Sequence, residues 1–253
     1  MKWLQFLLFL LNPLCVYAEW NTVERQNSPV PGAKLNASSL RITDGDNEAN
    51  ISFVYFAAGD VVLETVPNLD GQLGGLREIV ESKEALAGIN GGYFDNGLSP
   101  IGLLISNDRV VHGLQRAKLL SGIFYVKGGH PALARTREFP GVTGVRQAIQ
   151  CGPFLVDAGN PVPGLDNGRV AARTFIFSCG SSLWGFGICR SVTLAEMGRI
   201  LAEIPLVPDH PIRRALNFDG GSSTTFYVKT GNETIFSQGR PIVSNYLIAK
   251  PKH

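Results

Sequence analysis

The hydrophobic positions of this chain form short runs rather than long periodic stretches. Residues 39–43, 49–58 and 60–66 are rich in Val, Ile, Phe and Tyr and are separated by Gly, Asp and Asn, a pattern typical of β-strands. Further runs of this kind cover residues 101–106, 109–114, 121–129, 147–160, 173–179, 183–189, 213–218 and 224–239. We expect residues 173–189 to form a hairpin and residues 224–239 a terminal hairpin that turns near Gly231.

Two stretches follow a helical period instead. The first, residues 72–88, places Leu76, Ile79, Val80 and Leu86 roughly on one face. The second, residues 191–204, has apolar side chains at helical spacing after Thr193 and Glu196, which match a capping box. Because strands outnumber helices and do not alternate with them, the pattern predicts a single α+β domain. Its core would be a mixed or antiparallel β-sheet with a few helices packed on it.

Composition and charge indicate a globular domain and argue against one class of partner. The chain has 253 residues, of which 44% are hydrophobic, enough for one sizeable core. The formal net charge is +2 and the sequence contains no basic run, so nucleic acid is not an expected partner.

The first residues, MKWLQFLLFLLNPLCVYA, have the form of a secretory signal peptide. A positive charge, about ten apolar residues and a small residue at Ala18 predict cleavage near that position. We therefore expect residues 1–18 to be removed and the protein to be secreted or periplasmic, in the cell envelope, without stable membrane insertion afterwards. Residues 19–38 are polar and contain proline, which indicates a flexible lead-in before a domain at 39–253.

Cleavage there would leave three cysteines. In an oxidising compartment the simplest arrangement is one disulfide and one free thiol. Cys179 and Cys189 flank a glycine-containing hairpin, so the sequence predicts that they pair and that Cys151 is buried and inert.

The stretch NFDGGSSTTF, residues 217–226, carries the strongest candidate chemistry. A buried strand ends there in Asp219 and two glycines, whose backbone N–H groups could form a concave anion site. The carboxylate of Asp219 could ligate a metal, act as a base or attack an electrophile. The alternative is a tight turn in which Asp219 only caps backbone amides.

Two other segments have related features. In INGGYF, residues 89–94, a hydrophobic strand again runs into Asn-Gly-Gly and then an aromatic pair that could hold a sugar ring or could simply be core. Arg173 lies between apolar residues, so its permanent charge needs an anionic partner, either a structural carboxylate or a substrate phosphate.

Five motifs in order, INGGYF, QAI-x-x-GP-x-LV, ART, VTLAEM and LNFDGGSST, resemble the phosphodiester glycosidase family over residues 40–250. The resemblance implies a hydrolase that cleaves the glycosidic C1–O bond of a sugar-1-phosphodiester and releases free sugar and a phosphomonoester; with the predicted signal peptide, this enzyme would be exported. It assigns catalysis to Asp219 and Arg173. It assigns substrate binding to Asn90, Gly91, Gly92, Tyr93, Gly152, Thr174, Gly220, Gly221, Ser222 and Ser223. Glu196 is a candidate second carboxylate, although capping already accounts for it.

The residues by themselves also allow other functional hypotheses. A non-catalytic module that binds a glycan or sugar phosphate would use the same turns. A thiol hydrolase would use Cys151 or Cys179, but the four histidines have no informative context. No cofactor is expected, since no His/Cys cluster has zinc spacing; Asp219 with nearby carbonyls could accept Ca²⁺ or Mg²⁺.

Overall fold

The computed structural model describes residues 20–30, 32–230, 234–237 and 239–252. The predicted signal peptide and the predicted turn near Gly231 lie outside the described residues. Within them, three sheets are formed, and every strand pairing is antiparallel.

The first sheet has eight strands. In spatial order they are β1 (Asn21–Pro29), β2 (Leu35–Asp44), β3 (Asn47–Ala57), β14 (Leu183–Val192), β13 (Ala171–Ser178), β15 (Arg214–Asn217), β11 (Phe154–Asp157) and β12 (Asn160–Pro161). The predicted hairpin is the β13–β14 pair, in which Phe175 lies opposite Gly187. Strand β15 is buried in the middle of this sheet, as the apolar run RALNF predicts.

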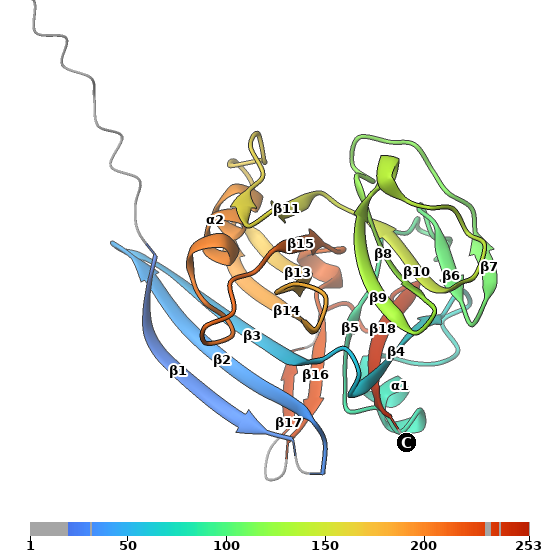
Figure 1. Cartoon of the computed structure of the whole chain (residues 1–253), viewed down its shortest axis with the longest axis horizontal. Coiled ribbons are helices and arrows are strands. Elements are labelled where there is room, and N and C mark those ends of the chain that lie inside the picture. Colours follow the sequence, from blue (N-terminus) through green and yellow to red (C-terminus); the bar gives the residue numbers. More distant parts are fainter. Residues whose placement is uncertain (1–19, 31, 231–233, 238, 253) are drawn as a thin grey trace, which may run out of the picture.

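The other two sheets have five strands each. The second sheet consists of β7 (Arg109–His112), β6 (Leu104–Ser106), β10 (Val145–Cys151), β8 (Gly122–Lys127) and β9 (His130–Arg135). The third consists of β17 (Thr234–Ser237), β16 (Phe226–Lys229), β5 (Ala87–Asn90), β18 (Asn245–Pro251) and β4 (Val61–Pro67). Figure 1 shows the long curved strands β1–β3 at one side and strands β6–β10 at the other, with β5, β16 and β18 drawn between them.

Apolar packing connects the sheets, in four clusters of buried side chains among the described residues. The largest cluster includes Val54 of β3, Phe124 of β8 and Leu247 of β18, one from each sheet, all fully buried. Shared burial of this kind fixes the sheets relative to one another, because opening the contact would expose all three side chains to water.

The two α-helices in the described residues are short. α2 (Leu194–Glu203) packs on β11 and β12, and its predicted capping box is present: Thr193 Oγ1 accepts from Glu196 N at 3.1 Å, and Glu196 Oε2 accepts from Thr193 N at 2.7 Å. α1 (Leu76–Ser82) buries Leu76, Ile79 and Val80 against the third sheet. It is shorter than the predicted 72–88, because Glu84 has a positive φ of 52° and residue 87 already begins strand β5.

The predicted α+β class is therefore correct only in part. The sheets are antiparallel and helices pack on them, but strands form most of the regular structure and the fold is predominantly β. The lead-in predicted over 19–38 is wrong in one respect, since β1 and β2 pair along it and join the first sheet. Buried Trp20 and Val30 at the ends of β1 attach this otherwise polar edge strand.

The predicted Cys179–Cys189 disulfide is also wrong. Cys151, Cys179 and Cys189 are all free. Cys189 lies opposite Arg173 in the hairpin, whereas Cys179 lies six residues after Arg173, just beyond the end of β13, where its N–H donates to Leu183 O at 2.9 Å. At about 3.3 Å per residue the two Cα atoms are about 20 Å apart along the ladder, well beyond the 7 Å limit for a disulfide.

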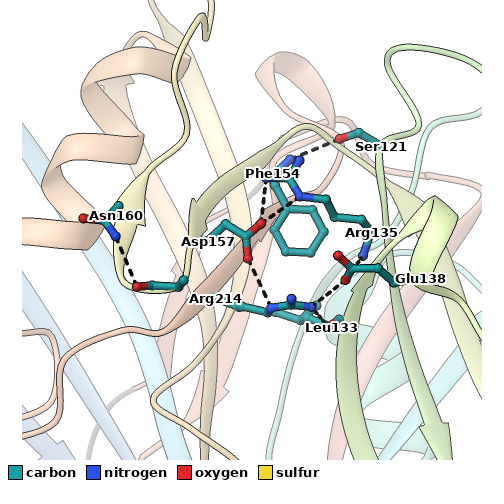
Figure 2. A network of polar contacts seen from close by, with 9 residues as sticks. Ser121, Leu133, Arg135, Glu138, Phe154, Asp157, Asn160 and Arg214 are labelled. Carbon is teal, nitrogen blue, oxygen red and sulfur yellow. Dashed lines mark hydrogen bonds and ion pairs between the residues drawn. The ribbon is translucent and has the colours of Figure 1, made fainter.

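An ion network joins the first and second sheets. Asp157 at the end of β11 contacts Arg135 of β9 at 2.7 Å and Arg214 of β15 at 3.2 Å, and Arg214 also contacts Glu138 at 3.0 Å (Figure 2). Both guanidinium groups lie over the ring of Phe154, at 5.1 and 5.8 Å from its centroid. The network holds the start of β15 in place, and the candidate site follows the other end of that strand.

Candidate active site

The two glycine-rich turns predicted from the sequence meet. The N–H of Asp219, just after β15, donates to Gly91 O at 3.0 Å, and the side-chain amide of Asn90 donates to Asp219 O at 2.7 Å. The ends of β15 in the first sheet and β5 in the third sheet are thus joined directly, and the carboxylate of Asp219 lies at their junction.

The buried side chains of Asn90 and Thr174 stabilise this junction by hydrogen bonds. Asn90 is almost fully buried, and its Oδ1 accepts from Thr174 Oγ1 at 2.7 Å and from Thr225 N at 3.0 Å. Its amide therefore cross-links β5, β13 and the segment after Asp219. With these donors and acceptors engaged, both side chains hold the turns together.

Glycine is required at several of these positions for lack of space. A Cβ on Gly91 would collide with Asn245 Oδ1, and a Cβ on Gly152 would collide with Leu119 O. A Cβ on Gly92 would lie 3.0 Å from Gln150 O, and one on Gly220 would lie 2.8 Å from Ala172 O. Close backbone approach is the physical reason for these glycines, and it brings the segment before Arg173 against the turn that carries Asp219.

The carboxyl group of Asp219 is only partly exposed. Its Oδ1 accepts from Gly220 N at 2.9 Å, which is the contact expected if Asp219 caps a tight turn. Burial nevertheless raises the pKa of Asp219, and hydrogen bonds from Ser223 and Gly220 and the charges of Arg240 and Arg169 oppose that rise. The side chain of Asp219 therefore caps its own turn and also has a raised pKa, and perturbed pKa values are typical of carboxyl groups at functional sites.

Arg173 is buried and makes no ion pair with any described residue. Its Nε donates to Val192 O at 3.2 Å and its Nη2 to Arg169 O at 2.5 Å. Burial and the nearby charge of Arg169 lower the pKa of Arg173. The sequence predicts an anionic partner for this charge. The structure gives its N–H groups carbonyl acceptors, and Asp166 acts on the charge only from a distance, without an ion pair.

Two further arginines border the site and were missed by sequence reasoning. Arg169 Nη2 lies 3.8 Å from the position a Cβ would take on Gly221, and the backbone N–H of Arg240 donates to Ser222 O. The guanidinium of Arg240 lies 6.0 Å from the ring centroid of Phe94. Both side chains are exposed, and nothing in NGRV or QGRP separates them from ordinary surface charges.

The turn after Asp219 offers further polar groups. Gly221 has a φ of +61° and begins a 3₁₀ turn, η2 (Gly221–Ser223), with Ser222 exposed and Ser223 buried. Among the described residues, the N–H groups of Gly221 and Ser222 find no acceptor. A cavity of about 360 Å³ adjoins this turn, with Ala172, Gly221 and Thr224 in its wall. Ligand-sized space therefore lies directly beside Asp219's turn.

Tyr93 and Cys151 fill the inner side of the site. Tyr93 Oη donates to Gly152 O at 2.6 Å and accepts from Asn217 Nδ2 at 3.3 Å. Cys151 is fully buried, and burial together with the charge of Asp219 raises the pKa of its thiol. A fully buried thiol is inaccessible to a substrate and is a poor nucleophile in its neutral form, so the burial of Cys151 argues against its use by a thiol hydrolase.

Other candidate groups are placed elsewhere. The carboxylate of Glu196 is occupied in its helix cap, so it does not provide a second carboxylate beside Asp219. In the described part of the chain, no group of three or more His, Cys, Asp or Glu side chains is arranged so that it could hold a metal ion. No helix among these residues is long and apolar enough to cross a membrane.

Together these features define a predominantly β protein whose strand-end turns place one carboxyl group among arginines that lack acidic partners. Comparison with known proteins agrees with that class. The family model for phosphodiester glycosidases matches residues 83–249, and the chain belongs to the phosphodiester glycosidase family. No curated protein matches the sequence at a significant level.

Solved structures share the fold at low sequence identity. The catalytic domain of zebrafish N-acetylglucosamine-1-phosphodiester alpha-N-acetylglucosaminidase is 16% identical, with a TM-score of 0.65 over 91% of this chain and 89% of that one. A hypothetical protein from Synechocystis is 14% identical, with a TM-score of 0.61 over 87% of this chain and 62% of that one. A protein from Burkholderia pseudomallei is 11% identical, with a TM-score of 0.58 over 84% of this chain and 74% of that one.

Proposed function

We propose that this chain is an exported hydrolase that cleaves the glycosidic C1–O bond of a sugar-1-phosphodiester of the N-acetylglucosamine type. The products are free sugar and a phosphomonoester. The observation that carries the proposal is the environment of Asp219: one partly buried carboxyl group under the charges of Arg169 and Arg240, in a turn that packs against the backbone of buried Arg173. None of the three arginines forms an ion pair with a described residue. Family membership supports the reaction class.

The leaving group explains why one carboxylate is enough. A usual glycosidase pairs an acid carboxyl with a second carboxylate, because the departing alcohol must be protonated. A phosphomonoester has a second pKa of about 6, so it departs near neutral pH with little protonation. Guanidinium groups and N–H donors that stabilise the developing phosphate charge can replace the acid.

In the proposed reaction Asp219 acts at the anomeric carbon while the arginines bind the phosphate. As a base, its carboxylate accepts a proton from water as the water oxygen bonds to C1. As a nucleophile, it bonds to C1 itself and water later hydrolyses that ester. In both cases the C1–O bond breaks and the phosphomonoester leaves with its electron pair. The anomeric configuration of the first sugar released distinguishes the two, since inversion indicates the base and retention the nucleophile.

The direct test is hydrolysis of the methyl diester of N-acetylglucosamine-1-phosphate in ¹⁸O-labelled water. Release of free N-acetylglucosamine carrying ¹⁸O at C1, with unlabelled methyl phosphate, would support the proposal. Sugar phosphate as the product would mean P–O cleavage and would contradict it. Saturable binding without any product would instead favour a non-catalytic glycan- or sugar-phosphate-binding module.

A second measurement addresses the metal question. The proposed mechanism needs no metal ion, so activity should persist after dialysis against EDTA. Loss of activity that Ca²⁺ or Mg²⁺ restores would instead place a divalent cation at the carboxylate of Asp219.

A further inference from the structure

A wide groove between the segment before β8 and the turn after β9 carries positive charge that is not balanced by an ion pair. The groove encloses about 770 Å³, and Arg116, Lys118 and Arg137 lie in its wall together with Ser121, Thr136 and Phe139. The three cationic side chains belong to exposed residues, and none of them makes an ion pair with any residue that the structure describes.

The neighbouring acids cannot compensate this charge, because they are already bound. Glu138 follows Arg137 directly, yet its Oε2 accepts from Arg214 Nη1 at 3.0 Å and from Arg135 N at 3.2 Å. Asp157 is held between Arg135 and Arg214 (Figure 2). The ion network thus takes up the local carboxylates and leaves the groove cationic.

The groove is also a fixed feature rather than a loose loop. Thr136 Oγ1 donates to Leu120 O at 2.6 Å and Thr136 N donates to Ser121 O at 3.0 Å, so η1 (Thr136–Glu138) is attached to the segment that carries Lys118. The buried amide of Gln150 donates to Gln115 O at 2.7 Å and so holds the same segment from the sheet side. Cations on a pre-formed wall bind an anion without the entropic cost of ordering a loop.

The groove shares a wall with the candidate active site. A Cβ on Gly152 would collide with Leu119 O and would lie 2.9 Å from Ser121 Oγ. On its other side, the carbonyl of Gly152 accepts from Tyr93 Oη at 2.6 Å and from Asn217 Nδ2 at 2.9 Å. Asn217 precedes Asp219 by two residues, so the backbone at Gly152 separates the groove from the residues that position the carboxylate.

From these observations we infer that the groove binds additional phosphate groups of the substrate, and that the preferred substrate is a polyanionic chain of sugars joined by 1-phosphodiester bonds. The inference rests on the proposed function, because it names the class of substrate for the same site. One phosphodiester would be bound at Asp219 while a phosphate further along the chain contacts Arg116, Lys118 and Arg137. Guanidinium and ammonium groups suit this role, since they bind phosphate by charge-assisted hydrogen bonds.

The test compares two substrates, the methyl diester of N-acetylglucosamine-1-phosphate and a synthetic trimer of N-acetylglucosamine joined by 1-phosphodiester bonds. At low salt we expect kcat/KM to be at least about tenfold higher for the trimer, with the advantage shrinking as salt screens the charges. The triple variant Arg116→Gln, Lys118→Gln and Arg137→Gln should lose most of this advantage and keep its activity on the methyl diester. A matched control, Arg109→Gln, Lys127→Gln and Lys252→Gln, removes three exposed cations elsewhere and should behave as wild type.

The outcomes separate the two proposals. Cleavage of both substrates without preference for the trimer, or an equal loss in both triple variants, would overturn the groove assignment and leave the proposed function standing. Failure of wild-type protein to cleave either substrate would overturn both. A single-stranded oligonucleotide should compete with the trimer only weakly; competition at equal phosphate concentration would overturn the assignment to sugar phosphodiesters.

Discussion

The arginines near the two ends of strand β15 differ in whether they form ion pairs. At its start, Arg214 joins Arg135 in a network with Asp157 and Glu138 that satisfies every charge locally (Figure 2). Just beyond its other end, Gly220, the neighbour of Asp219, packs against the backbone of Arg173, whose buried guanidinium has only carbonyl acceptors. Balanced charges stabilise the packing of two sheets, whereas an unbalanced buried charge costs stability and is typical of a binding site. The contrast gives each group of residues a distinct expected phenotype.

The largest effect should come from Asp219→Asn. The amide keeps the size and the acceptor for Gly220 N but can neither act as a base nor attack C1, so turnover should fall by about 1000-fold or more. Burial raises the pKa of Asp219, which means that the ionised form is disfavoured in the folded state. The variant should therefore unfold at the same or a higher temperature than wild type at pH 7. Wild-type turnover in a correctly folded variant would remove Asp219 from the mechanism.

Replacement of Arg173 should give the next largest loss. Arg173→Met removes a buried charge and should lower kcat/KM by about 100-fold, because one preorganised donor to the leaving phosphate is lost. Arg173→Lys retains the charge but not the planar guanidinium, so its kcat/KM should lie between those of wild type and Arg173→Met. Steady-state kinetics with the methyl diester checks the order, and equal activity in all three proteins would contradict a role for this charge.

The pH dependence should reflect the raised pKa of Asp219. The reaction needs the carboxylate, so kcat/KM should fall about tenfold per pH unit on the acid side, starting above the pH at which an ordinary aspartate titrates. Stability should change in the opposite sense. A carboxyl whose folded pKa is raised contributes stability below its unfolded pKa, and that contribution is lost as the pH rises through the folded pKa. An acid limb at or below the ordinary aspartate pKa would contradict burial as the dominant influence.

Disruption of the balanced network should affect stability rather than chemistry. Asp157→Asn leaves Arg135 and Arg214 without their shared carboxylate and should lower the free energy of unfolding by about 1–2 kcal/mol, since these groups are partly exposed to solvent. Activity per folded molecule should remain within about twofold of wild type. Urea titration gives the free energy of unfolding, and an assay at low temperature gives the activity of the folded protein. A loss of activity as large as that of Arg173→Met would show that the network also positions Asp219.

The smallest effects are expected at the cysteines. Because Cys179 and Cys189 are free and far apart along their hairpin, Cys179→Ser should change the melting temperature little under oxidising conditions. Burial raises the pKa of the Cys179 thiol to about 11 and also raises that of Cys151. Iodoacetamide at pH 7 should therefore react slowly with the folded protein and leave activity intact. If a reducing agent lowered the free energy of unfolding by several kcal/mol, that result would contradict free cysteines and support a disulfide.

Local patterns decided most of what could be predicted. The capping box at Thr193 and Glu196, the apolar run of β15 and the β13–β14 hairpin each depend on neighbouring residues, and all three are present. The errors arose where non-neighbouring segments decide the outcome. Polar residues 21–29 form an edge strand because β2 offers a partner, and the long predicted helix is cut short by β5, which is required in the third sheet.

The same division applies to the site. The sequence by itself marked Asp219, Arg173 and the two glycine turns as candidates, because glycines at strand ends can expose backbone N–H groups beside a charged side chain, although each feature also had a purely structural interpretation. Only the tertiary structure decided that Asn90 and Thr174 act as internal supports and that Arg169 and Arg240 border the carboxylate. Whether a charge is balanced depends on which carboxylates the fold brings within a few ångströms, and that distance is set by packing between sheets rather than by order along the chain.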